Sequence, residues 1–149
     1  METLAEQLYA LTPKEFEHAV AELFRAQGYQ AIVSGGRNDR GVAIHLKRDG
    51  QKAAVQCKRY KQPITPAQIR EFAGAMGEAA ADHGYFVTTS SFTRMARAAA
   101  KNSSVTIQLI DAAALGQRAG QIGWSWAKCG VKIAAWFSFF ATNGSRIKG

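Results

Sequence analysis

The sequence is poor in cysteine, proline and acidic residues, and it contains no long uncharged hydrophobic run. Two cysteines and three prolines occur among its 149 residues. Two cysteines form neither a disulfide framework nor a metal-ligand pattern, which excludes a disulfide-stapled secreted domain. Cys57 is therefore expected to be a reduced core residue of a cytoplasmic protein. The acidic start, Met-Glu-Thr-Leu-Ala-Glu, predicts no signal peptide.

Acidic residues are outnumbered by basic ones. The chain has 11 Asp and Glu against 19 Lys and Arg, a net charge of +8 and a pI near 9.8. Such a balance favours a polyanionic partner, because Lys and Arg release counterions when they bind phosphates. No Walker-type glycine and lysine spacing is present, so nucleotide hydrolysis is not supported. The three histidines, His18, His45 and His83, show no metal-ligand spacing.

The stretch from Gly41 to Lys58 predicts a β-hairpin. Asp49-Gly50 lies between two alternating runs, and a two-residue type I′ turn needs positive φ at both central positions. This turn fixes a register in which facing residue numbers sum to 99, so that position 43 faces position 56. Alternation then predicts two faces. The apolar face holds Val42, Ile44, Leu46, Ala53, Val55 and Cys57, and the polar face holds Ala43, His45, Gln56 and Lys58.

The segments around the hairpin predict an α/β fold. Thr12-Pro13 and Thr65-Pro66 each begin an amphipathic helix, and Gly28 ends the first one. Ser90 or Ser91 is expected to cap a further helix, and Asp111 another. Strands are expected at 29–33, 85–89 and 105–110. Helices alternating with strands after the hairpin predict a mixed sheet with helices on both faces, within one domain.

Several of these segments resemble the Mrr-like restriction endonucleases of the PD-(D/E)XK nuclease superfamily, in the variant with Gln at the second acid. The resemblance lies in Ser34-Gly-Gly-Arg-Asn-Asp-Arg-Gly-Val-Ala-Ile, Ala54-Val-Gln-Cys-Lys-Arg-Tyr, Phe16-Glu17, Gln27-Gly28-Tyr29 and Gly84-Tyr-Phe-Val-Thr-Thr-Ser. It covers roughly residues 11 to 115. It implies a restriction-endonuclease-like mixed sheet and Mg²⁺-dependent cleavage of double-stranded DNA of the restriction or defence type.

The resemblance also implies a site. An acid at position 43, the side-chain carbonyl of Gln56 and the backbone carbonyl of Cys57 would hold Mg²⁺, and Lys58 would orient or deprotonate the attacking water. Glu17 would hold a water beside the metal site, although its spacing alone favours an ordinary helix-flank carboxylate. The acid is missing, because position 43 is Ala43. Weak metal binding and little or no cleavage are expected, either because an Asp was replaced or because the domain is a natural non-cleaving DNA binder.

Phosphate contacts are expected from Arg37, Arg40, Arg59, Lys61, Arg94 and Arg97. Asp39 is interpreted as a loop-structuring residue rather than a secondary metal ligand. Paired strand cuts would need two active sites, so a homodimer is expected.

The chain is divided into a nuclease-like domain, 1–119, and an aromatic-rich segment, 120–149, which the resemblance does not cover. Residues 121–142 are too charged for a confident membrane span. A helix packed on the core or on a second copy is favoured over a membrane-surface helix, a membrane-associated nuclease effector or the lead into a further domain.

Overall fold

The computed structural model describes residues 3–34 and 41–126. The predicted loop residues Arg37, Asp39 and Arg40 and most of the aromatic-rich segment lie outside these ranges. The elements are α1 (Leu4–Tyr9), α2 (Pro13–Ala26), β1 (Gln30–Val33), β2 (Ile44–Arg48), β3 (Gln51–Lys58), α3 (Pro66–Glu78), β4 (His83–Thr88), α4 (Arg94–Lys101), β5 (Thr106–Ile110) and α5 (Ala112–Gln121).

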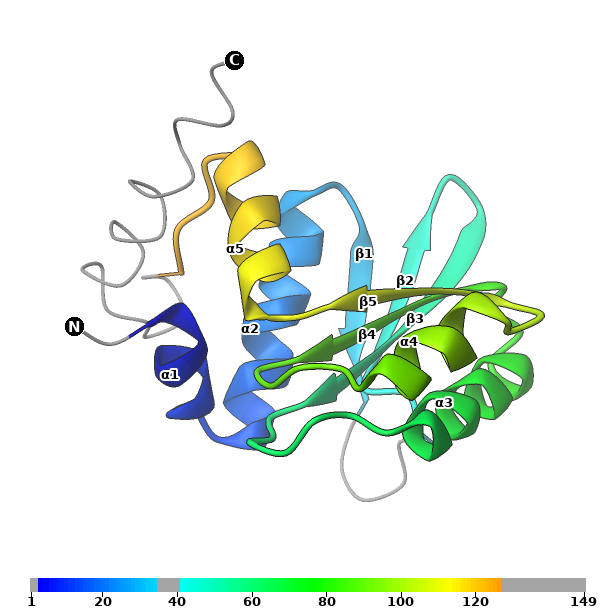
Figure 1. Cartoon of the computed structure of the whole chain (residues 1–149). Coiled ribbons are helices and arrows are strands. Elements are labelled where there is room, and N and C mark those ends of the chain that lie inside the picture. The colour runs from blue at the N-terminus through cyan, green and yellow to red at the C-terminus, as the bar shows by residue number, and fades with distance from the viewer. Residues whose placement is uncertain (1–2, 35–40, 127–149) are drawn as a thin grey trace, which may run out of the picture.

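One five-stranded sheet, in the order β1-β2-β3-β4-β5, forms the centre of the fold. Strands β1, β2 and β3 pair antiparallel, whereas β3, β4 and β5 pair parallel. Helices α2 and α5 cover one face, with α1 beside them, and α3 and α4 cover the other (Figure 1). The predicted α/β fold, a mixed sheet with helices on both faces, is confirmed.

Helix starts follow the predicted capping chemistry at three of four places, Thr12, Thr65 and Asp111. The Thr12 hydroxyl accepts a hydrogen bond from the Glu15 backbone N–H at 3.1 Å, and the Glu15 carboxylate accepts one from the Thr12 N–H at 2.8 Å. The bond from the Thr12 N–H, followed by the interaction with the Thr12 hydroxyl, stabilises the ionised carboxylate and lowers the pKa of Glu15. Thr65 and Gln68 form the same capping box at the start of α3.

The predicted cap of α4 is wrong, because the helix begins later. Thr93 is the N-cap and accepts from the Ala96 N–H at 3.0 Å. The Ser90 hydroxyl instead donates to the Lys61 carbonyl at 3.0 Å, and the Ser91 carbonyl accepts from the Ile64 N–H at 2.8 Å. Residues 90–92 are thus held against the chain that follows β3, and the helix starts only after them.

The hairpin has the predicted turn and register over most of its length. Asp49 and Gly50 have φ of 54° and 78°, as a type I′ turn requires. The partners from Ile44–Val55 to Arg48–Gln51 all sum to 99. The hairpin therefore fixes which side chains of β2 and β3 face α2.

The sheet separates two hydrophobic clusters. The cluster under α1, α2 and α5 includes Phe16, Phe24, Ile44, Val55 and Trp126, and the cluster under α3 and α4 includes Val42, Ala54, Ile69, Phe72, Met76 and Phe86. Gly84 is the point of closest approach in the second cluster. A β-carbon there would overlap the Met76 and Phe72 side chains, which would have to shift to admit it.

The predicted boundary at 119/120 falls inside α5, and the first aromatic residues beyond it pack on the core. Trp124 and Trp126 are buried against each other, with ring centroids 4.8 Å apart in an edge-to-face arrangement. Among the described residues, no helix is both long enough and apolar enough to cross a bilayer. Residues 127–149 lie outside the described ranges, so the expectations for this segment stay predictions.

Candidate active site

The end of β3 presents Gln56 and Lys58 in a hollow of about 240 Å³. Because side chains alternate along a strand, Cys57 between them faces α2 and packs on the other cluster. The hollow is lined by Gly41, Gln56, Lys58, Tyr60, Gln68, Glu71, Phe72 and Phe86. The predicted pairing of an amide and an ammonium on one face is therefore present, and α3 forms the facing wall.

Gln56 is fixed by two hydrogen bonds. Its Nε2 donates to the Gly41 carbonyl at 2.9 Å, and its Oε1 accepts from the Cys57 N–H at 2.9 Å. The side chain is 7% exposed. The amide thus ties β3 to the chain leading into β2, and one lone pair of Oε1 remains for a ligand.

Hydroxyl groups from the end of β4 hold the backbone that carries Lys58. Thr88 Oγ1 donates to the Lys58 carbonyl at 2.8 Å, Thr89 Oγ1 to the Tyr60 carbonyl at 2.9 Å, and Ser90 Oγ to the Lys61 carbonyl at 3.0 Å. These three residues belong to the motif Gly84-Tyr-Phe-Val-Thr-Thr-Ser. The motif was recognised in the sequence, but its anchoring role was not, because it needs the parallel pairing of β3 with β4.

Position 43 does not share the face of Gln56 and Lys58. Ala43 is 1% exposed and belongs to the cluster on the α2 side, while the Gln56–Lys58 hollow lies on the α3 side. Val42, expected beside Ile44, belongs to the opposite cluster. The predicted faces are wrong at these two positions.

A β-bulge explains this departure. The Ala43 N–H donates to the Val55 carbonyl at 2.8 Å, although Val55 is already the register partner of Ile44. Two residues of one strand thus oppose one of the other, which interrupts the alternation. The predicted register therefore holds for every pair from Ile44–Val55 to Arg48–Gln51. It fails at Ala43, one residue before β2 begins.

Glu17 lies on the same side of the sheet as Ala43. Its carboxylate is 3.6 Å from Lys14 Nζ. The pKa of the Cys57 thiol is raised well above its ordinary value, first by burial and then by the Glu17 charge, while Lys58 opposes the shift. Glu17 therefore lies near Cys57, but it is not among the residues that line the Gln56–Lys58 hollow.

Glu71 is the carboxylate that lines this hollow, and sequence reasoning missed it. It lies on α3 next to Phe72, at the flank of the apolar stripe that packs on the sheet. Helical spacing places such a flank residue beside the sheet. The signal existed, but only the structure shows that α3 faces Gln56 rather than another part of β3.

The donors available for a divalent cation are few. The described residues contain no group of three or more His, Cys, Asp or Glu side chains that would hold a metal ion. Mg²⁺ is usually held by one or two carboxylates, with water completing its shell. Glu71 is the one carboxylate among the residues that line the Gln56–Lys58 hollow, so this lining could hold such an ion only weakly.

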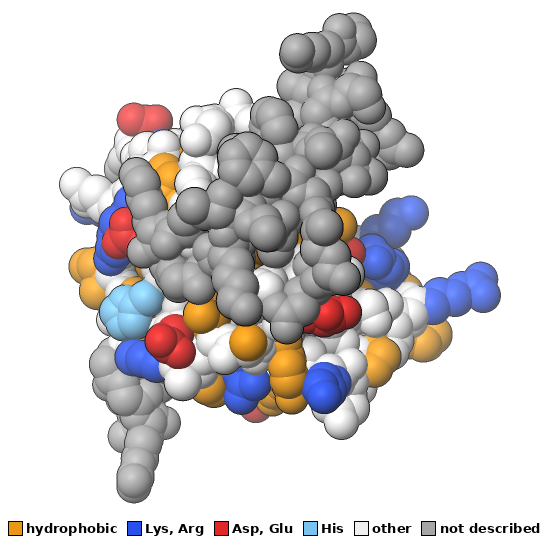
Figure 2. Space-filling view, turned by 90° about the vertical axis from the view of Figure 1, so that its left-hand side faces the viewer, with side chains coloured by type: hydrophobic (Ala, Val, Ile, Leu, Met, Phe, Trp, Pro, Cys, Tyr) orange, Lys and Arg blue, Asp and Glu red, His pale blue; other side chains and the backbone are white. Residues whose placement is uncertain are grey.

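The predicted DNA-contacting residues that the structure describes fall into two groups. Arg59 and Lys61 pack on Tyr9 of α1, at 4.8 and 5.0 Å from its ring centroid, and Arg59 also donates to the Tyr9 carbonyl at 3.1 Å. Arg94 and Arg97 are exposed on α4. Figure 2 shows Lys and Arg side chains along both margins of the face viewed there.

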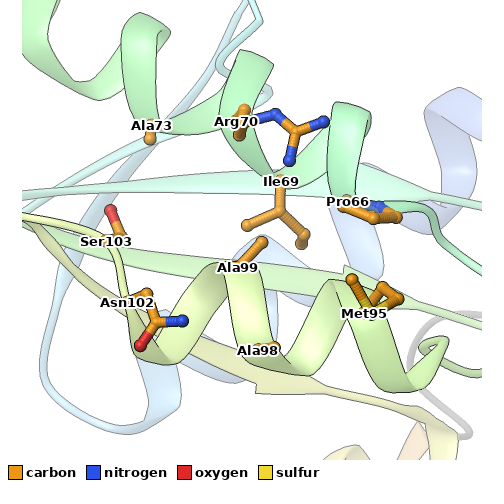
Figure 3. A pocket seen from close by; sticks show the side chains of 9 residues that line it. All are labelled: Pro66, Ile69, Arg70, Ala73, Met95, Ala98, Ala99, Asn102 and Ser103. Atoms are coloured by element: carbon orange, nitrogen blue, oxygen red, sulfur yellow. The ribbon is translucent and has the colours of Figure 1, made fainter.

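A larger hollow, of about 520 Å³, lies between α3 and α4 (Figure 3). Ile69, Ala99 and Met95 form its apolar part, with Arg70 at the edge. It shares no lining residue with the Gln56–Lys58 hollow and contains no carboxylate.

The sequence profile of the Mrr-type restriction endonuclease catalytic domain matches residues 8–118. The chain belongs to this restriction endonuclease family. A curated relative, the type IV methyl-directed restriction enzyme EcoKMrr of Escherichia coli (strain K12), is 33% identical over 100 residues, which cover 62% of this chain and 33% of the relative. The chain thus spans about a third of that relative's length.

Solved structures share the fold. The DNA modification-dependent restriction endonuclease AspBHI matches with a TM-score of 0.67 and 16% identity over 93% of this chain and 39% of its own. The MspJI restriction endonuclease, solved in complex with a 27-mer oligonucleotide, matches with a TM-score of 0.52 and 18% identity over 85% of this chain and 31% of its own. A protein of unknown function, AF1548, matches with a TM-score of 0.59 and 12% identity over 90% of this chain and its full length.

Proposed function

We propose that this Mrr-type domain binds double-stranded DNA and that its phosphodiester-cleaving centre is the Gln56–Lys58 hollow. The observation that carries the proposal is the placement of a buried, doubly hydrogen-bonded Gln56 beside Lys58 at the end of β3. A DNA-cleaving domain of this kind would act in the cytoplasm, in the restriction of foreign DNA or in defence against it. A homodimer would supply the two centres that paired strand cuts need.

Each residue of the hollow has a part in this chemistry. The Lys58 ammonium orients the attacking water and stabilises the charge that develops on the phosphate oxygens. Bound Mg²⁺ would supply a charge sink and lower the pKa of a water. The Gln56 and Cys57 carbonyl oxygens and the Glu71 carboxylate would hold that ion, and Glu17 would hold a water on the α2 side.

Ala43 leaves this set without the acid expected at position 43, and Glu71 is then its one carboxylate, so we expect weak Mg²⁺ binding and little or no cleavage by the chain as it stands. An Asp at position 43 reaches the hollow if the bulge gives way to the regular pairing of residue 43 with residue 56. DNA binding should be kept, because a missing carboxylate removes repulsion from phosphate.

Plasmid nicking by Ala43→Asp tests the proposal, with Ala43→Asn as the control of equal size and no charge. We expect Mg²⁺-dependent cleavage by the Asp variant and none by the Asn variant, on methylated plasmid, unmethylated plasmid or both. An Asp variant that binds Mg²⁺ and DNA yet leaves every plasmid intact would contradict the cleavage assignment.

A non-cleaving DNA-binding domain is the second candidate, and the burial of Ala43 in the apolar cluster favours it. In that case Asp at position 43 would only weaken the core. The wild-type chain would then bind DNA equally well with EDTA or Mg²⁺, and the Asp variant would gain no metal dependence in stability or in cleavage.

A further inference from the structure

A third hollow lies at the other end of the sheet, where β3 and β4 begin. Its volume is about 170 Å³, and it is lined by Tyr29, Arg48, Gln51, Lys52, Ala53, His83 and Tyr85. Lys58 lies six positions beyond Lys52 on β3, which corresponds to about 20 Å along the strand. This hollow is therefore separate from the proposed cleavage centre.

Two phenols meet at its wall. The hydroxyl oxygens of Tyr29 and Tyr85 are 3.1 Å apart and share one hydrogen bond. Burial, followed by the hydrogen bond to Tyr29, raises the pKa of Tyr85, so the Tyr85 phenol stays protonated at neutral pH. A pair of hydroxyls uses one proton between them, and the second proton remains available to a ligand.

Two guanidinium groups flank this pair in fixed positions. Arg48 lies 4.0 Å from the Tyr29 ring centroid and donates to the Gln27 carbonyl at 3.1 Å. Arg118 lies 5.2 Å from the Tyr85 ring centroid and donates to Gln27 Oε1 at 3.3 Å. A guanidinium has about five N–H donors, so most of those of Arg48 remain for an anion, whereas Arg118 does not line the hollow and adds only its charge. Stacking on the rings also reduces the side-chain entropy that binding would cost.

The charge of the hollow is positive. Its lining includes Arg48, Lys52 and His83 and no carboxylate. Asp49 and Asp82 are the sequence neighbours of Arg48 and His83, but both are exposed and neither lines the hollow. Neutral phenols and guanidinium forks are the donors that bind phosphate oxygens.

We propose that the Tyr29–Arg48–Tyr85 hollow binds a phosphate group, supplied by a free phosphate monoester or by a nucleic-acid strand. Arg48 forms the charge-assisted contact, Tyr29 or Tyr85 donates the phenolic proton, and Arg118 supports the field. The site does not depend on cleavage, so a Lys58→Met variant should keep it.

An NMR titration of the whole chain with inorganic phosphate tests this site. We expect amide shifts of residues 51–53 and 83–85 and at least a tenfold loss of affinity in Arg48→Gln. Lys47→Gln, which removes the same charge from the next residue on the opposite strand face, should change affinity less than twofold. Tyr85→Phe, which keeps the ring, should weaken binding several-fold.

Two oligonucleotide arms identify the source of the phosphate. Tighter binding of a 5′-phosphorylated short strand than of the unphosphorylated strand, lost in Arg48→Gln, indicates a terminal monoester. Equal binding of both, weakened by the same substitution, indicates the backbone diester. Phosphate that shifts no amide near the hollow, or that binds folded Arg48→Gln as it binds the wild type, would overturn the site while leaving the cleavage proposal untouched.

Discussion

At the scale of single residues, position 43 separates the two proposed functions, a cleaving and a non-cleaving DNA-binding domain. The residue two after the glycine of Gly41-Val42 carries the acid in the family that the sequence resembles, and here it is an alanine with 1% exposure. Gln56 and Lys58 are placed as expected, and Glu71 adds a carboxylate from α3. The hollow therefore contains an amide, an ammonium and one carboxylate, and the proposed centre lacks the acid expected at position 43.

Ala43→Asp should make stability depend on Mg²⁺. A carboxylate placed in the apolar cluster costs on the order of 3 kcal/mol when it has no partner. An ion that binds only the folded protein restores about 2.7 kcal/mol at 100 times its Kd. Thermal unfolding of the variant in EDTA and in Mg²⁺ measures this difference. Equal melting temperatures in both buffers would show that position 43 has no role in metal binding.

The Thr88 hydroxyl should matter for both stability and the site. It is fully buried, donates to the Lys58 carbonyl and accepts from the Ser90 N–H at 3.1 Å. Thr88→Val keeps the shape and removes both bonds, so we expect a loss of about 1–3 kcal/mol in the free energy of unfolding. Thr88→Ser keeps the hydroxyl and serves as the control in urea unfolding. A valine variant as stable as the serine variant would argue against this anchoring role.

At the scale of elements, local signals predicted most of the structure and long-range ones did not. The capping boxes at Thr12 and Thr65 and the turn at Asp49-Gly50 depend on neighbouring residues, which a sequence displays directly. The bulge at Ala43 needs a carbonyl of another strand, and the late start of α4 needs backbone contacts to Lys61 and Ile64. Contacts between distant segments decide such features, and periodicity does not reveal them.

Gly84→Ala should disturb the packing of α3 on β4. The added methyl would overlap Met76 and Phe72, and the core is too dense to accommodate it without displacing the helix. We expect a loss of about 1–3 kcal/mol, measured by chemical denaturation. Gly74→Ala provides the control, since nothing lies within 4 Å of a β-carbon there. Equal stability of the two variants would contradict the close approach.

At the scale of the whole molecule, charge and topology converge on one end of the sheet. Strands β3 and β4 end side by side, and Lys58, Tyr60, Lys61 and the start of α4 follow from there. Because the net charge is +8, the affinity of the chain for DNA should fall as the salt concentration rises. The nuclease fold, shared with AspBHI and MspJI, thus presents basic residues around the proposed centre.

Arg94→Gln should reduce the salt dependence of DNA binding. Each neutralised phosphate contributes about 0.9 to the slope of log K against log salt, so the loss of one contact lowers the slope by about 1. Fluorescence anisotropy with a short duplex at several salt concentrations measures it. Lys47→Gln is the control of equal charge, on β2. A slope that falls equally in both variants would place no phosphate contact at α4.

The most direct measurement of the central claim is the plasmid nicking rate of Ala43→Asp compared with Ala43→Asp/Lys58→Met in Mg²⁺. If the hollow at the end of β3 is the cleavage centre, the single variant nicks DNA and the double variant loses at least a hundredfold in rate while binding duplex DNA equally well. Equal nicking by the two variants would place the chemistry elsewhere in the molecule.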